Sequence, residues 1–535
     1  MITKNIKINL KKEKGITLIA LVITIIVLLI LAGVSIAFLT GDNGILTQTN
    51  KSKGENTKGK EKEQISLAVQ SLGIDSNQKN EILNINSENL KNQMISDGNK
   101  NIITEDINGS TKITFTDSKN QYFVDSSGNI ENYYEQPENV AKYWRAIKES
   151  DEDWYSYNDV SNGDKKVKVN TPKLAGNMKA IKYTGPEVNS QTGSKWANAI
   201  TTDGSMFVWI PRYAYKITEG YHTNQAGTIE VAFIDTSNKF LNGETGELTT
   251  NVEDPEAGKS KWLVHPAFTS NAEAGGGFGE IPGIWVGKFE STGEYTEGDA
   301  SKVSVKPGAI SLRNMTVNQQ YKAGMKATYG ESANLNSHMA KNSEWGATVY
   351  LAHSKYGVNK KKVEQNKSLL HYTGGTNIVE EIYTTNKTQS TTHNATGVYD
   401  LNGGKRERTA TYVNNGNENL GTYGGRNVGD LYGATEGEQS TSTKYKTVYN
   451  SENNQPKDYE TAGKKNKGDA VYETSVSGSN ETGVWFDAHA YFPFGAYPFL
   501  LRGGSYYDTL AGTFFFIYDK GYASGSFSFR LVLIS

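Results

Sequence analysis

The chain has 535 residues, so several folded units are expected, and it carries a net charge of -2 and no cysteine. The near-neutral charge argues against a broad electrostatic footprint for nucleic acid, and no nucleic-acid partner is expected. The absence of cysteine excludes disulfides, thiolate metal sites and a cysteine nucleophile. Glycine (55) and tyrosine (31) are abundant whereas proline (11) is scarce, a balance typical of a loop-rich protein that contains β-sheet.

The N-terminus combines a basic segment with a long apolar run. Residues 1–14 carry five lysines and one acidic residue, and residues 16–39 are uncharged and mostly apolar. About 20 apolar residues are enough to cross a bilayer as a helix, and the basic flank stays on the cytoplasmic side. The pattern predicts a transmembrane helix over residues 16–40, a single-pass location in the cytoplasmic membrane, and an extracellular C-terminal domain. A plain signal anchor is one interpretation of this segment.

A second interpretation rests on the string KGITLIALVITIIVLLILAGV. It resembles the leader of type IV prepilins, in which a dedicated peptidase cuts after the glycine and leaves the hydrophobic helix in the mature protein. The resemblance implies a leader over residues 1–15, cleavage between Gly15 and Ile16, and prepilin peptidase as a partner. Filament-forming pilins usually have glutamate at the fifth mature position, where this chain has Ala20. A membrane-held or minor-pilin role is therefore favoured over a true pilus.

Residues 41–135 are expected to form a small pilin-like stalk and head. Apolar residues between positions 51 and 70 form a ragged stripe, which predicts a helix. Further on, the strings KITFTD and QYFVD alternate apolar and polar residues and follow each other across a short polar stretch. This pattern predicts a β-hairpin.

A large second domain is expected over residues 140–535, because all eight tryptophans lie beyond residue 140. Short apolar runs predict strands at residues 206–217, 229–234 and 281–290 and in the terminal string SFRLVLI. Helices are predicted within residues 315–329 and 338–357. Long polar segments separate these elements, and binding sites commonly lie in such loop insertions.

Five strings of this domain occur in order: FVWIPRYAYKI, WVGKFE, KNSEWGATVYLAHSKYG, ATGVYDLNGG and a terminal stretch from LRGGSYYDT to SFRLVL. Together they resemble the family that contains formylglycine-generating enzymes, the sulfatase-modifying factors, and related C-type-lectin folds. The fold class expected for the chain is α+β: an N-terminal transmembrane pilin helix, a small pilin-like α/β stalk, and a large C-type-lectin-like domain with long loops. The resemblance also implies that the Arg-Gly-Gly strand and the final Phe-Arg strand lie near each other in a small antiparallel sheet.

Catalysis is not expected. The oxidase activity of formylglycine-generating enzymes depends on copper-binding cysteines, which this chain lacks, and no histidine-rich iron site like that of the sulfoxide-synthase relatives is present. The seven histidines show no metal-ligand spacing, so no cofactor or metal is expected and Ca²⁺ is not indicated. Scattered acids such as Glu290 and Asp400 leave a glycosidase pair open, because sequence alone does not place two carboxylates at a working separation.

The C-terminal stretch is rich in tyrosine, serine, glycine and aspartate, which binding loops favour. Strand alternation in GTFFFIY would bury either Phe514, Phe516 and Tyr518 or Phe515 and Ile517. The stretch resembles the variable region of diversity-generating retroelement target proteins, which use a C-type-lectin fold as a rigid frame. The resemblance implies a framework of Arg502, Gly503, Gly504, Gly512, Phe529 and Arg530. It implies that the ligand is contacted by Tyr506, Tyr507, Asp508, Thr509, Phe514, Phe516, Tyr518, Asp519, Tyr522, Ser524 and Ser526.

The functional hypothesis is a cell-surface display protein that binds a protein or glycan ligand through this C-terminal surface. Two alternatives stay open: a minor pilin or structural filament component without a specific ligand, and an exported hydrolase.

Overall fold

The computed structural model describes residues 45–79, 81, 83–107, 110–125, 128, 130–132, 143–151, 153–157, 169–185, 194–329, 335–375, 382–451, 458–480, 482–486, 489–508 and 512–535. The chain divides into two compact units, Met1–Glu135 and Gln136–Ser535. The expected leader, its cleavage between Gly15 and Ile16, and the helix expected over residues 16–40 lie outside the described residues.

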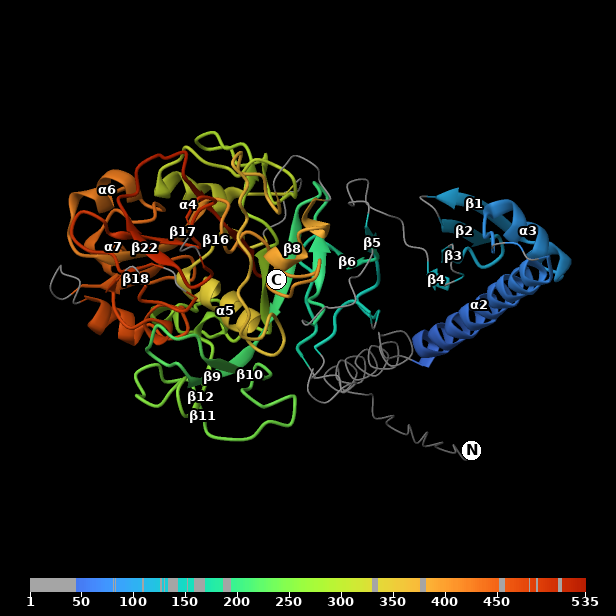
Figure 1. Cartoon of the computed structure of the whole chain (residues 1–535), viewed down its shortest axis with the longest axis horizontal. Helices are drawn as coiled ribbons and strands as arrows, with labels where there is room; N and C mark the ends of the chain where they lie inside the picture. Colours follow the sequence, from blue (N-terminus) through green and yellow to red (C-terminus); the bar gives the residue numbers. More distant parts are fainter. Residues whose placement is uncertain are drawn as a thin grey trace, which may run out of the picture. The chain divides into compact units, whose positions relative to one another are not determined.

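The first unit packs two helices on a small antiparallel sheet (Figure 1). The strand order is β1-β2-β3-β4, and the predicted hairpin is confirmed as β2 and β3. Apolar side chains from both helices and the sheet form one core, and the Tyr122 hydroxyl donates a 2.6 Å hydrogen bond to Glu61 of the first helix. The elements are α2 (Ile45–Lys79), α3 (Ser87–Ser96), β1 (Ile102–Ile107), β2 (Ser110–Phe115), β3 (Gln121–Asp125) and β4 (Ile130–Asn132).

The expected fold class is wrong. The described residues form mainly β-sheets with few helices and not the expected α+β arrangement. Among the described residues no helix combines the length and the apolar character needed to cross a membrane. The longest described helix, α2, carries lysine and glutamate in its middle turns. Charged side chains are costly to place in the hydrocarbon core of a membrane. The expected single-pass membrane location is likewise not supported.

The first sheet of the second unit has the strand order β16-β24-β13-β8-β7-β6-β5. Its centre is buried on both faces, and Trp209 of β8 lies directly opposite Trp285 of β13, with 5.2 Å between the ring centroids. Two such rings remove a large apolar area from water. The strands are β5 (Trp144–Ala146), β6 (Lys179–Tyr183), β7 (Asn198–Ile200), β8 (Met206–Pro211), β13 (Gly283–Gly287), β16 (His338–Met339) and β24 (Leu531–Leu533).

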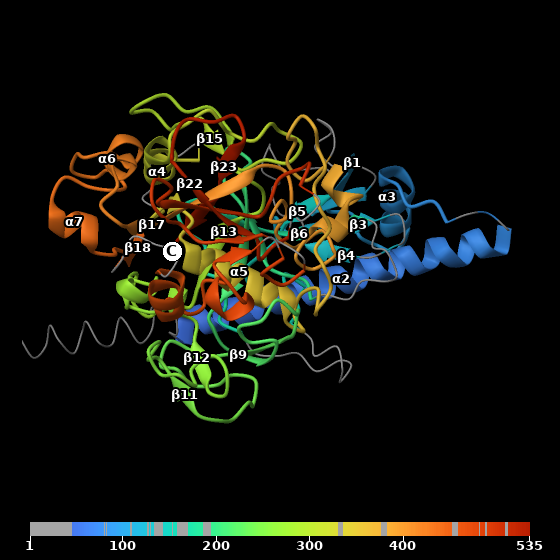
Figure 2. The same ribbon diagram turned by 60° about the vertical axis from the view of Figure 1, so that its left-hand side comes forward.

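The second sheet has the order β10-β9-β12-β11 and lies at one end of the second unit in both views (Figures 1 and 2). The strand predicted over residues 206–217 is in fact two strands in two sheets. The chain changes sheet at Arg212, whose buried guanidinium forms an ion pair with Glu280. The strands are β9 (Tyr213–Glu219), β10 (Thr228–Phe233), β11 (Leu248–Thr249) and β12 (Trp262–Val264).

The third sheet holds most of the C-terminal stretch. Its order is β18-β17-β21-β22-β20-β19, and β23 also pairs with β17. The strands are β17 (Arg406–Asn414), β18 (Thr447–Asn450), β19 (Ser479–Asn480), β20 (Ala490–Tyr491), β21 (Phe499–Arg502), β22 (Phe516–Asp519) and β23 (Phe527–Phe529). A separate pair is formed by β14 (Thr292–Gly293) and β15 (Val303–Ser304).

The helix α5 (Asn342–His353) joins the three sheets. It packs against β8, β10 and β17, one strand from each sheet, and every one of its residues is buried. A helix enclosed in this way is a core element rather than a surface helix. Helix α4 (Val317–Lys326) begins at a capping box, in which Thr316 and Gln319 bond each other's backbone N–H groups. The remaining helices are α6 (Glu418–Gly424) and α7 (Glu436–Ser440).

Candidate ligand-binding site

The expected framework arginine Arg530 is buried under the third sheet. Its guanidinium forms two hydrogen bonds with the Glu407 carboxylate, of 3.0 Å and 2.5 Å. It also donates to the carbonyls of Gly287 and Tyr399, at 2.8 and 2.9 Å. A planar guanidinium is suited to such a fixed set of acceptors, and here it joins three separate chain segments.

The two strands expected to lie near each other in one sheet are β21 and β23, and one further strand separates them. Glu407 of β17 is opposite Arg502 of β21 on one edge and Ser528 of β23 on the other. The strand β17 therefore lies between β21 and β23, and β23 runs parallel to it. The two strands therefore lie near each other in one sheet, as expected, but that sheet is mixed and not purely antiparallel, because β23 runs parallel to β17.

Arg502 and the two glycines after it fix the start of the C-terminal stretch. The Arg502 guanidinium is buried, lies 5.6 Å from the Trp345 ring and donates to the carbonyl of Ala470 at 3.0 Å. Burial lowers the pKa of Arg502 to about 10, while Asp469 opposes the shift. Gly503 and Gly504 have φ of 84° and 64°, which favour glycine, and a Cβ on Gly503 would lie 3.0 Å from the carbonyl of Leu401. Gly512 and Phe529 are also buried.

Four of the expected ligand contacts are buried, and for these the prediction is wrong: Asp508, Phe514, Phe516 and Asp519. Phe514 packs on Trp485 and His353, with ring centroids 5.2 and 4.8 Å apart. Phe514, Phe515 and Phe516 are all buried, whereas Ile517 and Tyr518 are half-buried, so the expected alternation fails.

The two buried acids are held by arginines. Asp519 accepts a 2.7 Å hydrogen bond from Arg408, and Asp508 lies 3.1 Å from Arg406. Both carboxylates therefore serve to hold the fold.

The other expected contacts remain accessible but belong to three neighbourhoods. Tyr506 and Tyr507 lie in the loop after β21, with Tyr507 63% exposed. Tyr518 is half-buried in a ring cluster with Tyr491, Phe494 and Tyr497. Tyr522 is 44% exposed and close to Tyr423 and Phe527, Ser524 is half-buried and Ser526 is exposed. Thr509 lies outside the described residues.

An open hollow of about 720 Å³ lies beside the loop after β21, and we call it the tyrosine hollow. The loop is fastened to the wall of the hollow. The side-chain amide of Gln365 donates to the carbonyls of Ser505 and Asp508, at 2.6 and 2.8 Å, and the Tyr506 N–H donates to the carbonyl of Gly404 at 3.0 Å. The lining residues are Lys362, Glu364, Gln365, Lys367, Gln389, Tyr506 and Tyr507.

Next to this hollow the chain exposes two consecutive leucines. Leu369 and Leu370 are 74% and 62% exposed, in a turn between Lys367 of the hollow and His371. The His371 ring packs edge-on against Tyr506 at 4.8 Å, and Tyr506 against Tyr507 at 5.0 Å. Burial, together with the nearby positive charges of Lys405 and Arg313, lowers the pKa of His371 to about 4, so the ring is neutral at pH 7.

The sequence pointed to Tyr506 and Tyr507 but not to the opposite wall of the hollow. That wall comes from residues 362–367 and from Gln389, more than 100 positions earlier, which the fold brings alongside the C-terminal loop. The only local signal is the pair Leu369 and Leu370 in the polar string KSLLHY, which has neither strand nor helix periodicity.

The acids considered for a glycosidase pair do not face a cleft. Glu290 and Asp400 are both buried, and Asp400 accepts hydrogen bonds from Asn366 and from the N–H of Gly374. Burial raises the pKa of each, and the negative charge of Glu407 raises that of Glu290 further. A glycosidase pair must reach the scissile bond, so this pair is not placed for that reaction.

Within the part of the chain that the structure describes, no group of three or more histidine, aspartate and glutamate side chains is placed to hold a metal ion. No protein-family model matches the chain, and no curated protein matches it. The resemblances drawn from the sequence remain predictions.

Proposed function

We propose that the protein binds a protein or glycan ligand through the tyrosine hollow and the adjacent leucines. Binding rests on surface complementarity, and the ligand is not chemically changed. The observation that carries this proposal is the exposed Tyr507 ring, held on a hydrogen-bonded loop beside Leu369 and Leu370. Exposed apolar groups gathered next to a hollow are typical of interaction surfaces.

The loop is well suited to binding because little of it has to be ordered when a ligand arrives. Gln365 holds two of its carbonyls and the neighbouring Asp508 is fixed by Arg406. Association costs free energy for every side chain and loop that it immobilises, so a loop held in advance binds more tightly. A tyrosine ring adds large contact area with few rotatable bonds.

The surroundings favour a protein over a glycan. The two leucines offer apolar area, while the charged residues Lys362, Glu364 and Lys367 line the neighbouring hollow. An apolar centre with a polar rim is the usual arrangement of protein interfaces.

The test is a selection for ligands with the full chain. A displayed library of random peptides is enriched on the immobilised protein after depletion on the Tyr507→Ala variant, and a glycan array is probed in parallel. We expect enriched peptides to lose about tenfold or more in affinity with Tyr507→Ala or Leu369→Ala, since hot-spot truncations cost about 1.4 kcal/mol or more.

Tyr522→Ala is the matched control, because this ring is also exposed but belongs to another neighbourhood. Binding that survives Tyr507→Ala, or that is lost equally with Tyr522→Ala, contradicts the proposal. If a glycan on the array binds and loses affinity with Tyr507→Ala, the ligand is a glycan and not a protein.

A further inference from the structure

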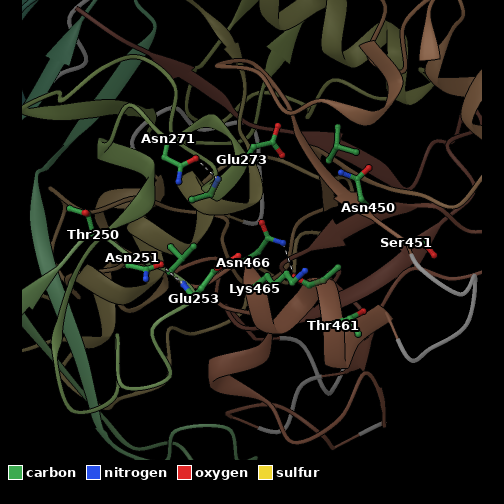
Figure 3. A pocket seen from close by; sticks show the side chains of 14 residues that line it. Thr250, Asn251, Glu253, Asn271, Glu273, Asn450, Ser451, Thr461, Lys465 and Asn466 are labelled. Carbon is green, nitrogen blue, oxygen red and sulfur yellow. Dashed lines mark hydrogen bonds between the residues drawn. The ribbon is translucent and has the colours of Figure 1, made fainter. Parts of the chain in front are cut away.

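A second hollow of about 380 Å³ opens in the second unit and has no lining residue from the C-terminal stretch, and we call it the amide pocket (Figure 3). Its lining comes from residues 250–253 between β11 and β12, residues 271–274, residues 448–451 of β18 and its end, and residues 461–466. In Figure 3 the labelled side chains of these segments extend around a common space. Its volume lies at the lower end of the range of about 300–1,000 Å³ typical of small-molecule sites.

Four asparagines contribute to the lining, and each is held at one end by the backbone. Asn251 accepts from the N–H of Glu253 at 3.0 Å, and Asn271 accepts from the N–H of Ala274 at 3.2 Å. These bonds identify the accepting atom as the amide oxygen. The NH₂ group of each residue takes no part in them and can donate to a ligand.

The other two asparagines are held in the opposite sense. Asn450 donates to the carbonyl of Ser440 at 3.0 Å, and Asn466 donates to the carbonyl of Ala462 at 2.7 Å. Their oxygens remain as acceptors. Within the described residues the pocket therefore has two amide donors and two amide acceptors whose positions are set by the fold.

The rest of the lining narrows the class of ligand. Glu253, Glu273 and Lys465 nearly balance in charge, and two carboxylates disfavour an anion. A divalent cation is disfavoured because the described residues contain no metal-holding group of acids and histidines. The remaining lining residues are small: the apolar Val252, Ala274, Val448 and Ala462, and the hydroxyl-bearing Thr250, Ser451 and Thr461.

We propose that the amide pocket binds a small neutral ligand with several hydroxyl groups, a mono- or disaccharide. Each sugar hydroxyl both donates and accepts, so it pairs with NH₂ groups and with amide oxygens alike. Its C–H faces fit the small apolar side chains. This site shares no residue with the tyrosine hollow, so it stands or falls independently of the function proposed above.

The test titrates the full chain with glucose, galactose, mannose and N-acetylglucosamine, separately and at millimolar concentration, and records saturation-transfer NMR. We expect transfer to at least one of the four sugars. Asn271→Asp and Asn251→Asp keep the oxygen that accepts from the backbone but replace the NH₂ donor. We expect each to weaken binding about tenfold, while the melting temperature stays unchanged.

Asn480→Asp is the matched control. Asn480 also accepts from the N–H two residues ahead, that of Thr482 at 3.0 Å, but it lies outside the pocket. Absence of transfer to all four sugars overturns the proposal, as does binding that Asn271→Asp and Asn251→Asp leave intact. Equal weakening by Asn480→Asp would show a general effect of charge and would overturn it too.

Discussion

Two aromatic segments of the C-terminal stretch have similar composition but opposite environments. The loop with Tyr506 and Tyr507 is accessible, with Tyr507 63% exposed. A few residues later, Phe514, Phe515 and Phe516 are all buried. The first segment directly follows strand β21, and the second leads into β22, the antiparallel neighbour of β21, which begins at Phe516.

The difference arises from where the backbone turns. Gly503 and Gly504 adopt left-handed conformations and lead the chain out of the sheet, toward Gln365 and its neighbours. The chain then returns to pair with β21, and there Phe514 lies on Trp485 and on His353 of the central helix. Position relative to the sheet, rather than residue type, decides which rings are available to a ligand.

The largest effect is expected for removing a buried ring. Phe514→Ala leaves a cavity among Trp485, His353 and Phe486, and such changes cost about 3–5 kcal/mol of unfolding free energy. Tyr507→Ala should change it by less than about 0.5 kcal/mol, because this ring is mostly exposed. Denaturant unfolding of the two variants checks the contrast. Similar losses in both would show that the loop ring is part of the core.

The sequence predicted those features that depend on local spacing. The hairpin of β2 and β3 and the helices α4 and α5 follow from short-range patterns, and all are present. The framework arginines were singled out by the resemblance, and Arg530 is buried with hydrogen bonds to Glu407 and to two carbonyls.

Features that depend on distant segments were not predictable in this way. The burial of Phe516 depends on the layers over β22, and the insertion of β17 between β21 and β23 joins residues about a hundred positions apart. The far wall of the tyrosine hollow is likewise remote in sequence. Side-chain periodicity reports which face of an element is apolar, but not which element covers it.

A second prediction concerns the pH dependence of stability, which should come from the buried carboxyl of Asp469 and not from the loop with Tyr506 and Tyr507. Burial raises the pKa of Asp469 from 3.8 to about 7, although the Tyr449 hydroxyl donates to it and Arg502 lies near. The folded state therefore binds this proton more tightly than the unfolded state. The resulting stability is fully present below about pH 4 and is lost as the pH rises through about 7.

We expect the unfolding free energy to fall between pH 4 and pH 7, with up to about 1.4 kcal/mol per pH unit from Asp469. Asp469→Asn cannot ionise and should make this slope shallower. Asp254→Asn is the control, because the N–H of Glu256 and the charge of Lys261 lower the pKa of Asp254, below this window. An unchanged slope in Asp469→Asn would mean that this carboxyl is charged throughout.

The smallest effect tests how the loop is held. Gln365 donates to the carbonyls of Ser505 and Asp508, and a hydrogen bond contributes about 0.5–1.5 kcal/mol. Gln365→Ala should therefore cost about 1–2 kcal/mol. It should also accelerate hydrogen exchange at the N–H groups of Tyr506 and Asp508, which bond to Gly404 and Ser505.

Gln389→Ala is the matched control, because Gln389 lines the same hollow and its buried side-chain oxygen has no hydrogen-bond partner among the described residues. It should leave both the stability and the exchange rates nearly unchanged. If Gln365→Ala weakened a Tyr507-dependent ligand without altering exchange at Asp508, Gln365 would be a direct contact and not the fastening of the loop. Faster exchange together with weaker binding would show that Tyr507 binds the ligand only while its loop is hydrogen-bonded to Gln365.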